Sequence, residues 1–151
     1  MNENYNTIIA REIVTSRVFK VPRETLYRAW TTPEFLEMWW GPAGFTNTFQ
    51  TYDLKPQGLW KFVMHGPDGI DYDNECEFIE VEKPSKLSWN HLSEPPFQVT
   101  VTFDEVSKDS AKVTFRMLFN TAAECETIKK YALAANEQNM EKLEALLEDI
   151  V

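Results

Sequence analysis

Cysteine is scarce in this sequence, and the short motifs that mark several common chemistries are missing from it. The two cysteines, Cys76 and Cys125, form no CxxC motif and have no histidine at metal-site spacing, so we expect buried, reduced thiols. A Gly-rich phosphate loop, a Gly-x-Ser-x-Gly elbow and a His-Glu-x-x-His helix are all missing. The sequence therefore predicts no metal ion, no cofactor and no catalytic residue, and it favours a non-enzymatic role.

Long apolar runs and an excess of positive charge are lacking as well. No apolar run approaches the eighteen or so residues of a membrane span, and residues 1–7 carry no apolar signal-peptide segment. The net charge of −9, from 15 basic and 24 acidic side chains, disfavours nucleic acid and anionic membranes as partners. The lack of a signal peptide and of a membrane span makes the cytoplasm the expected location. The length of 151 residues and the 43% of hydrophobic residues predict one packed domain over residues 1–151.

Proline and glycine are both missing from residues 121–151, and this stretch has helical periodicity. Apolar residues and one amide recur there at steps of three and four, which places them on one face of an α-helix. The stripe consists of Ile128, Ala132, Ala135, Asn139, Leu143, Leu146 and Ile150. Thr121 and Glu124 have the spacing of a capping box at its start. The pattern predicts one long amphipathic helix of roughly 45 Å, at about 1.5 Å per residue.

The preceding chain is rich in strand patterns. Residues 7–19 are predicted as a first strand, followed by a short helix after Pro22 and a second at residues 33–38, where Thr32 is the expected N-cap. Period-two alternation then predicts about six strands in successive hairpins. These strands fall near residues 45–53, 58–65, 70–81, 87–89, 97–103 and 113–119. The fold class is therefore α+β, with an antiparallel sheet whose buried face is covered by the long C-terminal helix.

Several short runs carry a family resemblance over residues 17–147. They are Ala29-Trp30-Thr31-Thr32-Pro33-Glu34, Trp39-Trp40-Gly41-Pro42, Gly58-Leu59-Trp60-Lys61-Phe62, Gly66-Pro67-Asp68-Gly69 and Pro96-Phe97 with residues 99–103. In this order the sequence resembles the homologues of the activator of the heat-shock-protein-90 ATPase (AHSA-like), within the START and birch-pollen-allergen-like (SRPBCC) superfamily. The resemblance implies a helix-grip fold, in which a curved antiparallel sheet of about six to seven strands wraps around the long helix. Two positions depart from the family pattern: Gln57 replaces the first of two glycines, and Asn136 replaces a tryptophan.

A sheet that grips a helix leaves a space between them, which is the natural site for a ligand. The candidate lining residues are Trp40, Trp60, Phe62, Met64, Trp89, His91, Phe97, Val99, Val101, Phe115, Met117, Tyr131, Ala135, Asn136 and Asn139. The alternative is that the aromatic residues simply fill a core. Asn139 is the most informative candidate, because a buried amide on an apolar stripe needs hydrogen-bond partners from the protein, a ligand or water.

The two histidines are the acid–base candidates. His65 follows a strand beside a turn, where we expect it to be solvated. The neighbour of His91 depends on strand register: pairing Phe78 with Trp89 places His91 across from Cys76, whereas pairing Ile79 with Trp89 places it across from Glu77. We favour a structural role for His91 in either register, because neither pair comes with a third group or oxyanion donors. The acidic run of Glu75, Glu77, Glu80 and Glu82 is interpreted as a solvated strand face.

Three functions fit these observations. The favoured one is binding of a small hydrophobic or aromatic molecule, oriented by Asn136, Asn139, His91 or Tyr72. The second, implied by the family resemblance, is a co-chaperone-like regulator that contacts a heat-shock chaperone. The third is a cyclase or aromatase-type enzyme that acts in the same cavity, which would need an acid–base group inside it. Both a monomer and a homodimer remain open.

Overall fold

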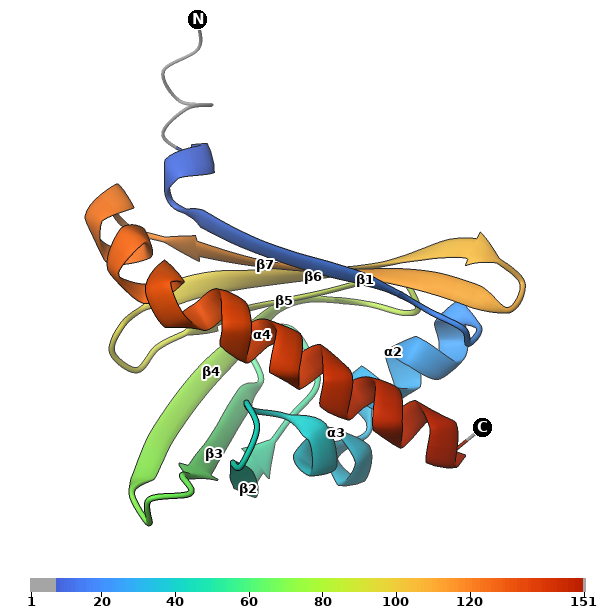
Figure 1. Ribbon diagram of the computed structural model, residues 1–151, viewed down its shortest axis with the longest axis horizontal. Coiled ribbons are helices and arrows are strands. Elements are labelled where there is room, and N and C mark those ends of the chain that lie inside the picture. The colour runs from blue at the N-terminus through green and yellow to red at the C-terminus, as the bar shows by residue number, and fades with distance from the viewer. Residues whose placement is uncertain (1–7, 151) are drawn as a thin grey trace, which may run out of the picture.

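The computed structural model describes residues 8–150 and shows one curved antiparallel sheet crossed on its inner face by a long helix (Figure 1). In chain order the elements are β1 (Glu12–Phe19), α2 (Arg23–Thr31), α3 (Pro33–Trp39), β2 (Thr46–Tyr52), β3 (Leu59–His65), β4 (Asp71–Glu82), β5 (Lys86–His91), β6 (Phe97–Ser107), β7 (Ser110–Phe119) and α4 (Ala122–Ile150). The seven strands lie in the order β1-β7-β6-β5-β4-β3-β2. The predicted α+β helix-grip class is confirmed.

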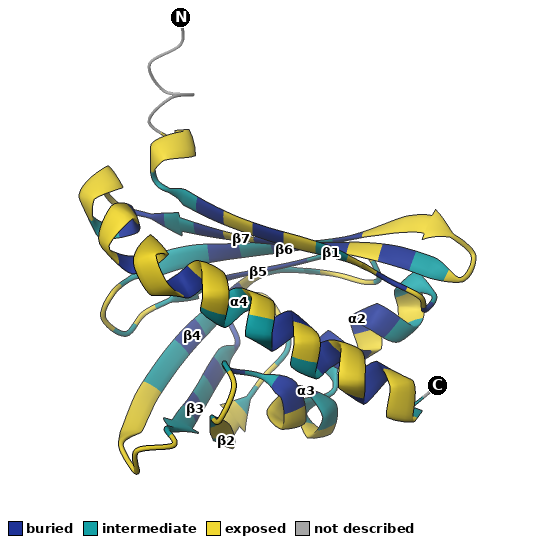
Figure 2. Cartoon of the chain, viewed as in Figure 1, coloured by how far each residue is buried: buried dark blue, intermediate teal, exposed yellow. Residues whose placement is uncertain are grey.

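The apolar stripe of α4 faces the sheet as its periodicity predicts. Ile128, Ala132, Asn139, Leu143 and Leu146 are all buried, and the exposed residues of α4 lie on its other side (Figure 2). The helix begins at Ala122, directly after the predicted cap, and the backbone N–H of Glu124 donates to Thr121 Oγ1 at 3.1 Å. Residue 151, which the prediction included, lies outside the described residues.

Two short helices between β1 and β2 bring tryptophans into the core. Thr32 joins them: its N–H donates to Arg28 O at the end of α2, and it is the N-cap of α3. The indole N–H of Trp39 donates to Ala29 O at 3.0 Å, and its ring meets that of Trp30 at a centroid distance of 4.7 Å. Helix α3 thus matches the predicted residues 33–38 and extends one residue further, to Trp39.

The first strand is shorter than predicted. Residues 8–10 are helical and Arg11 N–H donates back to Ile8 O, so the strand assignment was wrong for residues 8–11, while residue 7 lies outside the described part. The reason is the length of the neighbouring strand, because Glu12 pairs with Leu118 and β7 ends one residue later. Residues before Arg11 would need partners beyond Phe119, where β7 has already ended.

Strand register settles the two alternatives for His91. Phe78 pairs with Trp89, which places His91 directly across from Cys76. Both cysteines are buried and free, as expected. Glu75 and Glu80 of the acidic run pair with Lys61 and Lys86, at 3.9 and 3.1 Å.

Candidate functional site

A cavity of about 150 Å³ lies between the inner face of the sheet and α4. Five consecutive strands, the loop after α3 and the middle of α4 all contribute to its wall. The lining residues are Trp40, Gly41, Pro42, Phe62, Met64, Asn74, Cys76, Trp89, His91, Phe97, Val99, Phe115, Met117, Ala135, Asn136 and Asn139. The strand residues are pairs at positions i and i+2, because alternate side chains of a strand point to the same face.

Most of the predicted site residues meet around this cavity. The twelve that do so are Trp40, Phe62, Met64, Trp89, His91, Phe97, Val99, Phe115, Met117, Ala135, Asn136 and Asn139. Trp60 and Val101 are buried in the core, where Trp60 packs against Trp40 and Trp89 at centroid distances of 5.3 and 5.5 Å. Each lies two positions along its strand from a lining residue, Phe62 or Val99, so both share the inner face of the sheet but lie beside the cavity.

Tyr131 was wrongly placed, and its side chain is 63% exposed. It precedes the buried Ala132 by one residue, which turns it by about 100° away from the stripe that faces the sheet. Tyr72, a suggested orienting group, is 44% exposed and lies near the Phe45 ring at a centroid distance of 6.1 Å instead of lining the cavity.

Sequence reasoning missed four lining residues. Asn74 and Cys76 share a face of β4 with the buried Phe78, so period-two alternation through Phe78 could have identified them. Gly41 and Pro42 follow Trp40 directly, but no periodicity extends into a loop.

Aromatic rings form much of the wall. Trp40, Trp89 and Phe115 lie within 6.0 to 6.5 Å of one another by ring centroid, in tilted or edge-on orientations. Such a wall favours a flat apolar guest that can stack on one ring and meet the edge of another.

His91 is held by three contacts in the wall of the cavity. Its Nε2 lies 2.8 Å from Asn74 Oδ1, its Nδ1 lies 3.2 Å from Pro95 O, and its ring stacks on Phe97 at 4.4 Å. Burial lowers the pKa of His91, although the Pro95 carbonyl acts in the opposite direction. The contacts fix the orientation of the ring, and burial disfavours its charged form.

The Cys76 and His91 pair lacks the properties of a nucleophile and its base. Burial, reinforced by the nearby Glu75 carboxylate, raises the pKa of Cys76 to about 12. The reactive thiolate is then scarce at neutral pH. Both ring nitrogens of His91 face acceptor oxygens, Asn74 Oδ1 and Pro95 O, instead of a group that the ring could deprotonate.

The loop that closes one wall is tied to α4. Lys142 Nζ donates to the carbonyl oxygens of Gly41, Pro42 and Phe45 at 3.2, 3.5 and 3.1 Å, and burial lowers the pKa of this lysine. Gln138 Oε1 accepts from the N–H of Ala43 at 3.1 Å. Gly41 has a φ of +99°, and an added Cβ would lie 2.8 Å from the Met64 methyl group. The helix therefore fixes the loop as part of the cavity wall.

Two amides of α4 reach the cavity and differ in their hydrogen bonding. Asn136 Nδ2 donates to Met117 Sδ at 3.5 Å. Asn139 is only 6% exposed, and its Oδ1 has no hydrogen-bond partner among the described residues. Buried polar atoms normally have a partner, so this oxygen needs explanation.

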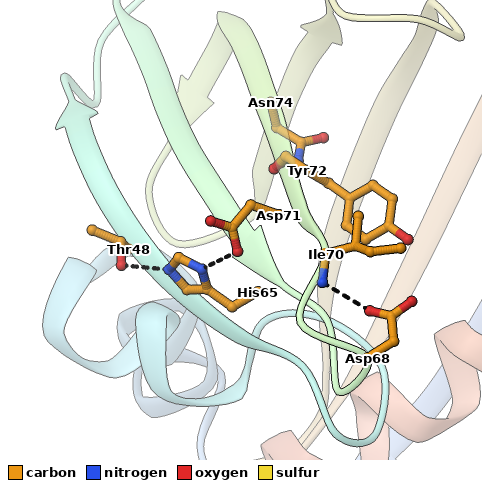
Figure 3. Close-up of polar contacts among 7 residues, drawn as sticks. All are labelled: Thr48, His65, Asp68, Ile70, Asp71, Tyr72 and Asn74. Atoms are coloured by element: carbon orange, nitrogen blue, oxygen red, sulfur yellow. Dashed lines mark hydrogen bonds and ion pairs between the residues drawn. The ribbon is translucent and has the colours of Figure 1, made fainter.

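A second polar cluster lies on the outer face of the sheet (Figure 3). His65 Nδ1 lies 2.7 Å from Asp71 Oδ1, and His65 Nε2 lies 2.7 Å from Thr48 Oγ1. This order resembles a hydrolytic triad, but Thr48 and Asp71 are exposed, His65 is partly exposed, and an efficient triad works in a site that excludes water. We interpret the cluster as a structural contact that links β2, β3 and β4 through their side chains.

Over residues 8–150, no helix is both long and apolar enough to cross a membrane. In the same range, no three His, Cys, Asp or Glu side chains come together in a way that could hold a metal ion.

Comparisons with known proteins identify a family from the sequence and a shared fold from solved structures. The profile of the family described as "Activator of Hsp90 ATPase homolog 1-like protein" matches residues 20–148. A search of curated proteins found no match. A crystal structure from Nitrosomonas europaea has 22% identity and a TM-score of 0.85, over 93% of this chain and 96% of that chain.

Two further solved structures have the same fold. A protein from Mycobacterium smegmatis has 22% identity and a TM-score of 0.84, over 95% of each chain. The AHSA1 protein from Silicibacter pomeroyi has 19% identity and a TM-score of 0.72, over 91% of this chain and 97% of that chain.

Proposed function

The chain belongs to the Activator of Hsp90 ATPase homolog 1-like family, and from this premise we propose that it binds a small apolar or aromatic molecule in the cavity beneath α4. One observation carries the proposal: aromatic side chains from separate elements converge on a cavity that also presents a few polar groups. That combination is typical of small-molecule sites.

Binding of this kind works through shape and desolvation. A guest that leaves water for the cavity lined by Trp40, Trp89 and Phe115 gains about 25 cal/mol for each Å² of apolar surface that it buries. Among the polar groups of the wall, Asn139 has an unpartnered oxygen and would orient the guest. An enzymatic role receives less support, because Cys76 is protonated and His91 is held by protein contacts.

Tryptophan fluorescence provides the test, since Trp40 and Trp89 both line the cavity. We expect toluene and phenol, as representative single-ring compounds, to change the emission in a saturable way. Ala135→Leu places a larger side chain in the cavity and should weaken binding about tenfold or more. Ala134→Leu is the matched control, because Ala134 is the preceding residue of α4 and is exposed.

The contrast between the two alanine variants decides the result. Saturable binding that Ala135→Leu removes and Ala134→Leu retains supports a site in the cavity. Equal binding by both variants, or no saturable change in the wild-type protein, would contradict the proposal.

A chaperone contact is the second candidate function. Besides the family description, it is favoured by Ile70 and Tyr72, which are 52% and 44% exposed beside the turn between β3 and β4 (Figure 3). Exposed apolar side chains that gather at one place often mark protein contacts. If this candidate is correct, the chain should change the ATPase rate of a heat-shock-protein-90 chaperone and Tyr72→Ser should reduce the effect. An unchanged ATPase rate with the wild-type chain would rule it out.

A further inference from the structure

The cavity is half open, so its volume limits the part of a guest that it can enclose. At about 150 Å³ it is smaller than the roughly 300–1,000 Å³ of pockets for drug-sized ligands. An engineered apolar cavity of about 150 Å³ in another protein accommodates benzene. A single aromatic ring with a small substituent is therefore the size class that fits.

The polar groups of the wall differ in what they offer such a guest. Both ring nitrogens of His91 face acceptor oxygens, Asn74 Oδ1 and Pro95 O, and the single N–H of the neutral ring donates to one of them. Asn136 donates to Met117. Asn139 Oδ1 is buried and has no partner among the described residues, a property that no other lining atom shares in this part of the chain. The amide also lies on the apolar stripe of α4, where a leucine would satisfy the periodicity equally well.

From these observations we infer that the cavity selects single-ring aromatic molecules that carry a hydroxyl group, a phenol class, with the hydroxyl hydrogen-bonded to the Asn139 amide. The inference rests on the proposed function and adds the chemical class of the guest. The ring is taken up by the aromatic and aliphatic wall. The hydroxyl group supplies the hydrogen bond that the protein does not supply to Asn139 Oδ1, which an apolar ring of the same shape cannot do.

Phenol and toluene are the matched probes, because they have the same ring and differ by a hydroxyl or a methyl group. Toluene leaves water more readily, so the informative quantity is the ratio of the two dissociation constants in wild type and in Asn139→Leu. We expect the substitution to shift this ratio about tenfold in favour of toluene, as the loss of one buried hydrogen bond implies. Glu141→Gln, on the exposed side of α4, should leave the ratio unchanged.

The outcomes separate this inference from the proposed function. If both compounds bind but Asn139→Leu leaves their ratio unchanged, selection by Asn139 is wrong and ligand binding in the cavity stands. If neither compound binds to the wild-type protein, the proposed function fails and the selectivity fails with it.

A second measurement avoids the variant and protects the test against a folding defect. In the wild-type protein, the side-chain amide signals of Asn139 in a ¹H–¹⁵N spectrum should move further on addition of saturating phenol than on addition of saturating toluene, because both rings lie against the amide and only phenol donates to Oδ1. Equal movement with both probes would overturn the inference.

Discussion

Gln57 has a φ angle of +70°, a left-handed backbone conformation that favours glycine. Its N–H donates to Phe78 O at 2.8 Å in the turn between β2 and β3, which fixes this conformation. Its side chain is exposed, so little packing depends on it. We predict that Gln57→Gly raises the free energy of unfolding by about 0.5–1 kcal/mol, because glycine adopts this φ without the steric penalty. Urea denaturation measures the change.

Gln98 in β6 is the control for this substitution. Its backbone is extended and paired with Asn90 and Leu118, so Gln98→Gly should lower the free energy of unfolding. A loss of stability in both variants would show that the φ angle of Gln57 carries no appreciable strain.

His91 gives the stability of the fold a dependence on pH. Burial lowers its pKa in the folded state, whereas in the unfolded chain the value is near 6.5. The unfolded state therefore binds more protons between these two values, and stability falls as the pH drops from about 6.5 toward the folded-state pKa. We predict that His91→Gln flattens this part of the curve of unfolding free energy against pH.

Urea denaturation at several pH values between about 5 and 7.5 gives both curves. His65→Gln serves as a comparison, because this histidine lies on the solvent side of the sheet. Parallel curves for wild type and His91→Gln would show that His91 titrates alike in the folded and unfolded chain.

At the scale of elements, α4 does two jobs, since it covers the sheet and holds the loop of residues 41–45. Three carbonyl oxygens of that loop accept hydrogen bonds from Lys142. We predict that Lys142→Met increases amide hydrogen exchange in residues 41–45 several-fold while exchange in the strands changes little, because the loop opens locally without global unfolding. Hydrogen exchange followed by mass spectrometry measures both regions.

Lys130→Met is the matched control on the same helix, because Lys130 is exposed. It should leave exchange in residues 41–45 at the wild-type rate. Unchanged exchange in the loop of Lys142→Met would mean that other contacts, such as Gln138 with Ala43, are sufficient to hold it.

Most helices and strands could be predicted from local sequence patterns. The boundaries that depend on long-range strand pairing could not. The stripe of α4 and the cap at Thr121 follow from spacing alone, so the helix could be predicted to within one residue at its start. The start of β1 could not be predicted from local spacing, because it depends on where the partner strand β7 ends. Tyr131 was misplaced because it adjoins the stripe, and a helix places adjacent residues on different faces.

At the scale of the molecule, the sheet curves around α4 (Figure 1). The cavity is lined by residues of both. The existence of such a space follows from the helix-grip class, and period-two alternation identified most of its strand residues. Its volume and the unpartnered state of Asn139 Oδ1 did not follow, because both depend on the packing of side chains from seven elements or loops.

A ligand that binds only the folded chain must also stabilise it. We predict that phenol at about 100 times its dissociation constant raises the free energy of unfolding by about 2.7 kcal/mol in the wild-type protein. With binding weakened tenfold or more, Ala135→Leu should be stabilised by about 1.4 kcal/mol or less at the same concentration. Thermal denaturation with and without phenol measures the difference, and equal stabilisation of both proteins would point to binding outside the cavity.

The most direct measurement is a chemical-shift titration of the uniformly ¹⁵N-labelled protein with phenol. If the cavity is the binding site, the largest saturable shifts will belong to its lining residues, including the indole N–H of Trp40 and Trp89 and the amide of Asn139. Saturable shifts that cluster elsewhere, for example around Ile70 and Tyr72, or the absence of any saturable shift, would contradict ligand binding beneath α4.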